Sequence, residues 1–179
     1  MKTKIISKII PGIGAAVALA FVACLPGTAN AQALPKPVAT VFDNYLLIQT
    51  ALAQDSVKDV AKEAQAIATA VNDDAAKSFS TNIAQQAQAV AKAADLHGVR
   101  EAFKPLSNLL IEYVSKHPSL AGTYRQVHCP MANADWLQKE TTVNNPYLGK
   151  EMPHCGEFIK AKTDGGPGSQ GHSMPGMDM

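Results

Sequence analysis

The sequence predicts an all-α fold: an up-down four-helix bundle, then an irregular C-terminal segment that contains cysteine and methionine, then a disordered tail. Three observations support this prediction. Four stretches place apolar residues three or four positions apart, which is the period of a helix with one buried face. Aromatic residues make up only 6% of the chain while alanine is common, and this composition favours closely packed helices over a β-sandwich. With 179 residues, the chain has the size of one domain with extensions.

The N-terminal residues have the pattern of an export signal. Three lysines within the first eight residues precede an apolar stretch at 9–25, and Ala29 and Ala31 provide an A-x-A end. This order is typical of a cleavable secretory signal peptide, here residues 1–31. Lipidation at Cys24 is the less favoured alternative, because the residues before it suit that signal poorly. We therefore expect a periplasmic protein without membrane insertion after cleavage.

The four predicted helices run over residues 37–53, 57–71, 80–96 and 99–117. Asp55 is predicted to cap the start of the second helix, a position that aspartate favours. The pair His97-Gly98 is predicted to end the third helix, because glycine accepts the left-handed conformation found there. Pro105 is expected either to kink the fourth helix or to mark its true start. The short connections between these helices favour an up-down arrangement.

The composition of the chain changes after the fourth helix. Residues 124–158 are rich in proline, asparagine, glycine and sulfur, and residues 144–147 (Asn-Asn-Pro-Tyr) are a strong turn signal. We expect irregular structure there, within a domain that spans 34–160. Residues 161–179 are dominated by Gly, Pro, Ser, His, Met and Asp, which cannot build a core. They are predicted to form a flexible, disordered tail.

Sulfur is confined to the last third of the chain after signal cleavage. Both remaining cysteines and all five remaining methionines fall between positions 129 and 179. Two short arms each combine a thiol, a thioether and an imidazole; their donors are His128, Cys129 and Met131 in the first and Met152, His154 and Cys155 in the second. Soft thiolate and thioether ligands select Cu(I), and imidazole also suits copper or zinc. A Cu(I) site made by the four sulfurs, with a histidine completing or replacing one ligand, is chemically coherent.

A disulfide between Cys129 and Cys155 is the alternative for the two thiols. Thiols of an exported protein usually pair, and a bridge that closes a loop of about 26 residues would stabilise the fold by roughly 3–4 kcal/mol. Spacing alone favours this bridge. The methionine and histidine neighbours on both arms favour a metal site instead, because a structural disulfide needs neither. The two states can also interconvert, with oxidation releasing the metal.

The tail is a second, weaker candidate for copper binding. Its donors are His172, Met174, Met177 and Met179. Thioethers do not form disulfides, so they suit copper capture in an oxidising compartment. Such a tail could hold copper weakly and pass it to the folded site. The alternative is a low-complexity end without a function.

Other function classes have little support in the sequence. Charged residues make up only 17% of the chain and the basic ones are not clustered, which argues against nucleic-acid binding. Serine-hydrolase, zinc-protease, phosphate-loop and haem-attachment motifs are absent from the sequence, so we do not expect an enzyme. We expect His97 and His117 to be helix-end or surface residues. Trp136 is expected to pack in the core, although its ring could also touch bound copper.

The segment that carries these donors resembles a known family. The elements are Cys-Pro-Met at 129–131, Trp-Leu at 136–137, Asn-Pro-Tyr-x-Gly at 145–149 and Met-x-x-Cys-Gly at 152–156. Together with Arg100, Phe103, Leu106 and Ser107, they resemble a family of bacterial secreted domains of unknown function over roughly residues 38–158. This family occurs alone and attached to periplasmic adaptor subunits of heavy-metal efflux pumps.

The resemblance implies a helical domain associated with efflux of copper or a related metal. It marks Cys129, Met131, Met152 and Cys155 as the metal set. Many members of the family have a longer insertion than residues 132–135 provide here, so the local loop geometry differs.

Two functions remain open from the sequence. The first is a periplasmic Cu(I)-binding protein that acts as a chaperone, buffer or resistance factor and feeds a heavy-metal efflux system. The second is a helical interaction module, stapled by a Cys129–Cys155 disulfide, that docks on an envelope transporter without a metal role.

Overall fold

A computed structural model describes residues 34–159 of the chain. The predicted signal peptide, Cys24 and the predicted tail at 161–179 lie outside these residues. The elements are α1 (Lys36–Ala53), α2 (Val60–Asn72), α3 (Thr81–Lys92), α4 (Leu96–Ser115), α5 (Pro118–Ala121), β1 (Arg125–Cys129), β2 (Ala134–Gln138) and β3 (Glu157–Phe158). No helix among the described residues is long and apolar enough to cross a membrane.

The four long helices form where the apolar period predicts them, but the boundary between the third and the fourth is shifted. His97 and Gly98 lie in the first turn of α4 and do not end α3. Asp95 precedes α4 as its N-cap, and its carboxylate accepts a 2.7 Å hydrogen bond from the Gly98 N–H. A capping carboxylate satisfies a free N–H of the first turn, so this cap decides the boundary. The helix then continues through Pro105 without ending.

The start of the second helix also differs from its prediction. The residue before α2 is Asp59, in a left-handed conformation with φ 61°, and its side chain makes no capping hydrogen bond. Asp55 lies outside the helix and binds groups that are distant in sequence instead: the Arg100 guanidinium and the Lys150 N–H. The predicted cap is therefore wrong, because long-range partners occupy the carboxylate.

The segment predicted to be irregular contains an antiparallel sheet with strand order β2-β1-β3. In the β1–β2 hairpin, Val127 is opposite Trp136 and Cys129 is opposite Ala134. Val127 and Cys129 are buried while His128 between them is only half-buried, which is the alternation of a strand with one face on the core. The chain is therefore mostly helical with a small sheet, and the all-α class is corrected.

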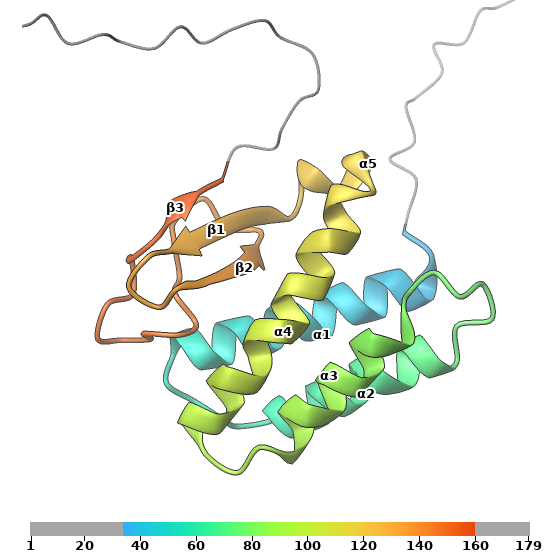
Figure 1. Cartoon of the computed structure of the whole chain (residues 1–179), viewed down its shortest axis with the longest axis horizontal. Helices are drawn as coiled ribbons and strands as arrows, with labels where there is room; N and C mark the ends of the chain where they lie inside the picture. The colour runs from blue at the N-terminus through green and yellow to red at the C-terminus, as the bar shows by residue number, and fades with distance from the viewer. Residues whose placement is uncertain (1–33, 160–179) are drawn as a thin grey trace, which may run out of the picture. The chain divides into compact units, whose positions relative to one another are not determined.

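The sheet packs against α4 and shares one hydrophobic core with the helices. Figure 1 shows the strands together on one side of α4, with α2 and α3 on the other side. Strand β2 contacts both α1 and α4. Between these two helices the rings of Tyr45 and Phe103 stack with centroids 4.9 Å apart. Trp136 on β2 is completely buried, which confirms its expected place in the core.

Candidate metal centre

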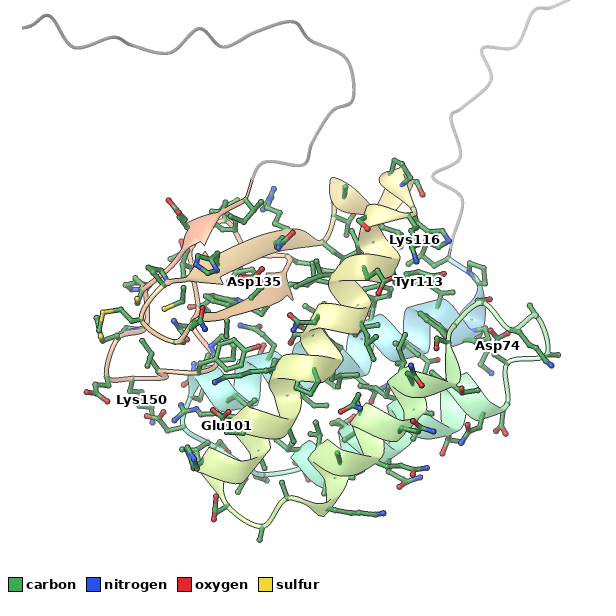
Figure 2. The ribbon with its side chains drawn as sticks, viewed as in Figure 1. Asp74, Glu101, Tyr113, Lys116, Asp135 and Lys150 are labelled. Atoms are coloured by element: carbon green, nitrogen blue, oxygen red, sulfur yellow. The ribbon has the colours of Figure 1, made fainter. Side chains whose placement is uncertain are left out.

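The two cysteines converge on one point of the surface. Cys129 ends β1 and is buried, whereas Cys155 lies in the loop before β3 and is half-buried. Their Sγ atoms are 2.9 Å apart although 26 residues separate them, and both thiols are free. Figure 2 shows the sulfur atoms of the described residues gathered beside the tip of the β1–β2 hairpin. The geometry needed for a shared site, or for a disulfide after a small movement, is therefore present.

The hairpin turn fixes the position of the Cys129 sulfur. Pro130 follows the strand, and Asn133 closes the turn in a left-handed conformation with φ 44°. The turn directs the Ala132 N–H at the Cys129 Sγ, at 3.4 Å. A sulfur that receives backbone N–H groups is stabilised as a thiolate.

The two thiols differ in acidity. Burial raises the pKa of Cys129, but hydrogen bonds from the Cys155 thiol and from backbone N–H groups outweigh it, so the pKa lies below its ordinary value. The hydrogen bond that Cys155 donates to the Cys129 sulfur raises the pKa of Cys155. Cys129 is therefore the more acidic thiol of the pair. A thiolate is the form that binds soft metal ions.

The Cys155 arm is held by its neighbours in the loop. The Cys155 N–H donates to the Met152 carbonyl at 3.1 Å. Gly156 has φ 145°, and a Cβ placed there would lie 2.9 Å from Cη2 of Trp136. A side chain at this position would therefore meet the indole ring, so glycine allows the arm to pass close to the core.

The two methionines of the arms are exposed. The Met131 side chain is 67% exposed and that of Met152 is 36% exposed, although methionine is usually a core residue. Met131 also lines a hollow of about 480 Å³ between the hairpin turn and the first turns of α4. Two thioethers thus lie in solvent on the same two arms that carry the thiols.

The predicted histidines do not join the sulfur pair. His128 extends from the other face of β1, and its Nδ1 lies 2.5 Å from an Asp135 carboxylate oxygen. His154 is exposed, with Nδ1 2.7 Å from the Val143 carbonyl oxygen. Within residues 34–159, no three His, Cys, Asp or Glu side chains lie close enough together to hold a metal ion. Among the described residues, the two cysteines therefore have no third ligand of these four types beside them.

A second group of contacts anchors the loop that leads to Cys155. The Arg100 side chain donates to the carbonyl oxygens of Pro146 at 2.8 Å and Leu52 at 3.0 Å, and to Asp55 Oδ1 at 2.6 Å. The other Asp55 oxygen accepts from the Lys150 N–H at 3.2 Å. This ion pair connects the end of α1, α4 and the loop. Sequence reasoning noted Arg100 as part of the resemblance but did not predict its partner.

Asn145 is a further residue whose role the sequence did not reveal. It is completely buried, and its side-chain Nδ2 donates to the Cys155 carbonyl oxygen at 2.6 Å. The turn signal at 144–147 placed a bend there and gave no indication of this contact.

Comparison with known proteins gives one match. Residues 41–120 match the family model described as a protein of unknown function (DUF3347). The DUF3347 match runs from α1 into α5 and ends before β1. The Cys129 and Cys155 arms therefore lie outside it, and the function of the matched region is not known from the family description. No curated protein and no solved structure matches this chain.

Proposed function

We propose that this chain is a periplasmic Cu(I)-binding protein that acts as a chaperone, buffer or resistance factor linked to heavy-metal efflux. One observation carries the proposal: the sulfurs of Cys129 and Cys155 lie 2.9 Å apart, on arms that each also hold an exposed methionine. The ligand set we propose is Cys129, Met131, Met152 and Cys155. A periplasmic adaptor subunit of an efflux pump is the partner that we propose as recipient.

The chemistry of the donors supports a monovalent ion. Thiolate and thioether groups are soft ligands and favour Cu(I) over harder divalent ions. Cys129 provides a sulfur fixed by the hairpin turn, while Cys155 is half-buried and can meet an arriving ion. Thioethers do not form disulfides in an oxidising compartment, so Met131 and Met152 suit the capture and release of copper.

The predicted tail adds to the same proposal. His172, Met174, Met177 and Met179 would form a weaker site that delivers copper to the sulfur pair. These residues lie outside those that the structure describes, so this part of the proposal depends on their donor chemistry alone.

The second candidate function is an interaction module without a metal. The same sulfur pair supports it, because two thiols at this separation can oxidise to a disulfide with little movement. The bridge would join the β1–β2 hairpin to the loop that carries Cys155, and the stapled domain would dock on an envelope transporter.

A titration with Cu(I) under anaerobic conditions tests the first function. The full mature chain is titrated in competition with a chromophoric Cu(I) chelator, beside a Cys129→Ser, Cys155→Ser variant. We expect a sub-nanomolar site in the wild type that is lost in the double variant. A variant with the four tail donors replaced is the matched control and should retain the tight site. Unchanged copper stoichiometry in the cysteine variant contradicts the proposal.

Titration of free thiols separates the two functions. Protein prepared anaerobically from the periplasm should contain two free thiols, or bound copper, if the first function is correct. A fully oxidised pair, together with no Cu(I) binding after reduction, supports the stapled interaction module.

A further inference from the structure

We propose that Asn145 is the positioning residue of the sulfur pair: its buried amide holds the Cys155 arm in place beside Cys129 and sets the copper affinity without binding the ion. This inference rests on the proposed Cu(I) function. Asn145 is 0% exposed and lies in the loop between β2 and β3, so no exchange with solvent weakens its contacts.

The amide nitrogen of Asn145 holds the second arm. Nδ2 donates to the Cys155 carbonyl oxygen at 2.6 Å, directly beside the half-buried thiol. The backbone N–H of Asn145 donates to the Pro153 carbonyl at 2.9 Å, two residues earlier on the same arm. Two hydrogen bonds from one residue therefore fix the chain on which Cys155 sits.

The amide oxygen of Asn145 binds the turn that follows it. Oδ1 accepts from the backbone N–H groups of Tyr147 at 2.8 Å and Leu148 at 2.9 Å. Since two donors point at this atom, it must be the oxygen, and the nitrogen must face Cys155. The orientation of the amide is thus determined by its surroundings.

The loop that Asn145 holds also contacts the hairpin that carries the first arm. Tyr147, whose N–H binds Asn145 Oδ1, donates its hydroxyl to the Asp135 carbonyl oxygen on β2 at 2.8 Å. Asn145 therefore links the backbone of the Cys155 arm to the β1–β2 hairpin through Tyr147. Groups that orient a metal ligand through a hydrogen bond typically change metal affinity by about 10–100-fold when they are replaced.

The chemistry of this position requires both a donor and an acceptor. Asp in place of Asn keeps the acceptor for Tyr147 and Leu148 but loses the donor to Cys155 and adds a negative charge. Ser keeps a short acceptor that can serve the turn, adds no charge, and is too short to reach Cys155. The two substitutions together separate loss of the donor from the effect of charge.

Copper affinity and disulfide closure in these variants test the inference. We expect Asn145→Asp and Asn145→Ser each to bind Cu(I) about 10–100-fold more weakly than the wild type. In a dithiol/disulfide buffer without copper, we expect the equilibrium constant for Cys129–Cys155 closure to fall about tenfold in both, since the sulfurs are no longer held together.

Asn144→Asp is the matched control. Asn144 is half-buried, and the hydrogen bonds that it makes among the described residues use its backbone N–H and carbonyl, not its side chain. The Asn144→Asp variant places the same charge one residue away from position 145. Its Cu(I) affinity and its equilibrium constant for Cys129–Cys155 closure should remain near the wild-type values.

The outcomes distinguish this inference from the proposed function. If Asn145→Ser keeps the wild-type Cu(I) affinity and the wild-type equilibrium constant for disulfide closure, the inference is overturned and the Cu(I) function is left intact. An effect that occurs only in the charged Asn145→Asp variant has the same consequence. A wild type that does not bind Cu(I) contradicts the proposed function instead. A loss of thermal stability without a change in either constant shows a structural role only and also overturns the inference.

Discussion

The hydroxyl of Tyr45 on α1 accepts a 3.0 Å hydrogen bond from the Leu137 N–H on β2, across 92 residues of sequence. Strand β2 is an edge strand, since the order of the sheet is β2-β1-β3. The Tyr147 hydroxyl donates to the Asp135 carbonyl of the same strand at 2.8 Å. Two tyrosine side chains thus replace the missing neighbouring strand and allow the edge to be buried against the helices.

Removing the Tyr45 hydroxyl should destabilise the fold through this edge. Tyr45→Phe leaves the buried Leu137 N–H without a partner, which typically costs about 1–3 kcal/mol. The free energy of unfolding, measured with urea, should fall by that amount. Tyr113→Phe is the control, because the Tyr113 hydroxyl makes no hydrogen bond within the described residues, and it should change stability by less than about 0.5 kcal/mol. Equal effects in the two variants would contradict this role of Tyr45.

The helices could be predicted from the sequence because their signal is local and repeated. The apolar period located all four long helices, including the one that continues through Pro105. Only the boundaries of these helices were predicted wrongly, at positions where capping by a side chain competes with another local signal. At Gly98 the carboxylate of Asp95 decided the boundary, and at Asp55 an ion pair with Arg100 removed the expected cap.

The sheet was missed because its strands are too short to show a period. Strands β1 and β2 have five residues each and lie in a segment whose Pro, Asn and Gly content is typical of loops. The two cysteine sulfurs lie 2.9 Å apart, a proximity that both alternatives from the sequence, a shared metal site and a disulfide, require. Strand alternation turns His128 away from Cys129, and contacts such as Asn145 to Cys155 have no sequence signal.

Gly149 should be intolerant of any side chain. It has φ 54°, and a Cβ at this position would lie 1.8 Å from Asp55 Oδ1 and 2.3 Å from Arg100 Nη2. Gly149→Ala must therefore adopt a strained backbone and also separate the ion pair, so we expect a loss of more than about 1 kcal/mol in unfolding free energy.

Gly122→Ala provides the control for this substitution. Gly122 has φ −72°, and a Cβ there would meet no atom within 4 Å. Alanine fits this conformation and restricts the unfolded chain, so the variant should be as stable as the wild type or more stable by about 0.4–1 kcal/mol. Equal losses in both glycine variants would exclude the clash as the cause.

The ion pair between Asp55 and Arg100 should make stability depend on acid pH. The hydrogen bond from Arg100 holds the pKa of Asp55 below its ordinary value in the folded state. Its contribution is therefore complete above the pKa of the unfolded chain and is lost as the pH falls through the lower folded pKa.

Unfolding of an Asp55→Asn variant over a pH series measures this effect. The variant should be less stable than the wild type near neutral pH, and the difference should shrink between about pH 5 and pH 2. Asp43→Asn, which removes a 3.8 Å surface contact with Lys139, should change stability by no more than about 0.5 kcal/mol. A stability difference for Asp55→Asn that does not change with pH would contradict the assignment.

The two methionines, and not the two histidines, should determine how tightly copper binds beside the cysteines. His128 is engaged by Asp135 and His154 by the Val143 carbonyl, whereas Met131 and Met152 are exposed on the arms of the sulfur pair. A Met131→Leu, Met152→Leu variant should therefore bind Cu(I) about tenfold more weakly, or about 1.4 kcal/mol. The matched His128→Asn, His154→Asn variant should keep the wild-type affinity.

X-ray absorption of the copper-loaded protein identifies the ligands directly. In the wild type we expect sulfur scatterers at about 2.3 Å, the usual distance to a thiolate. The methionine variant should lose part of this shell, since thioether sulfur is replaced, while the histidine variant should give the spectrum of the wild type. A shell of nitrogen and oxygen that disappears only in the histidine variant would contradict sulfur ligation. It would require His128 to leave Asp135 and cross to the other face of β1 on binding.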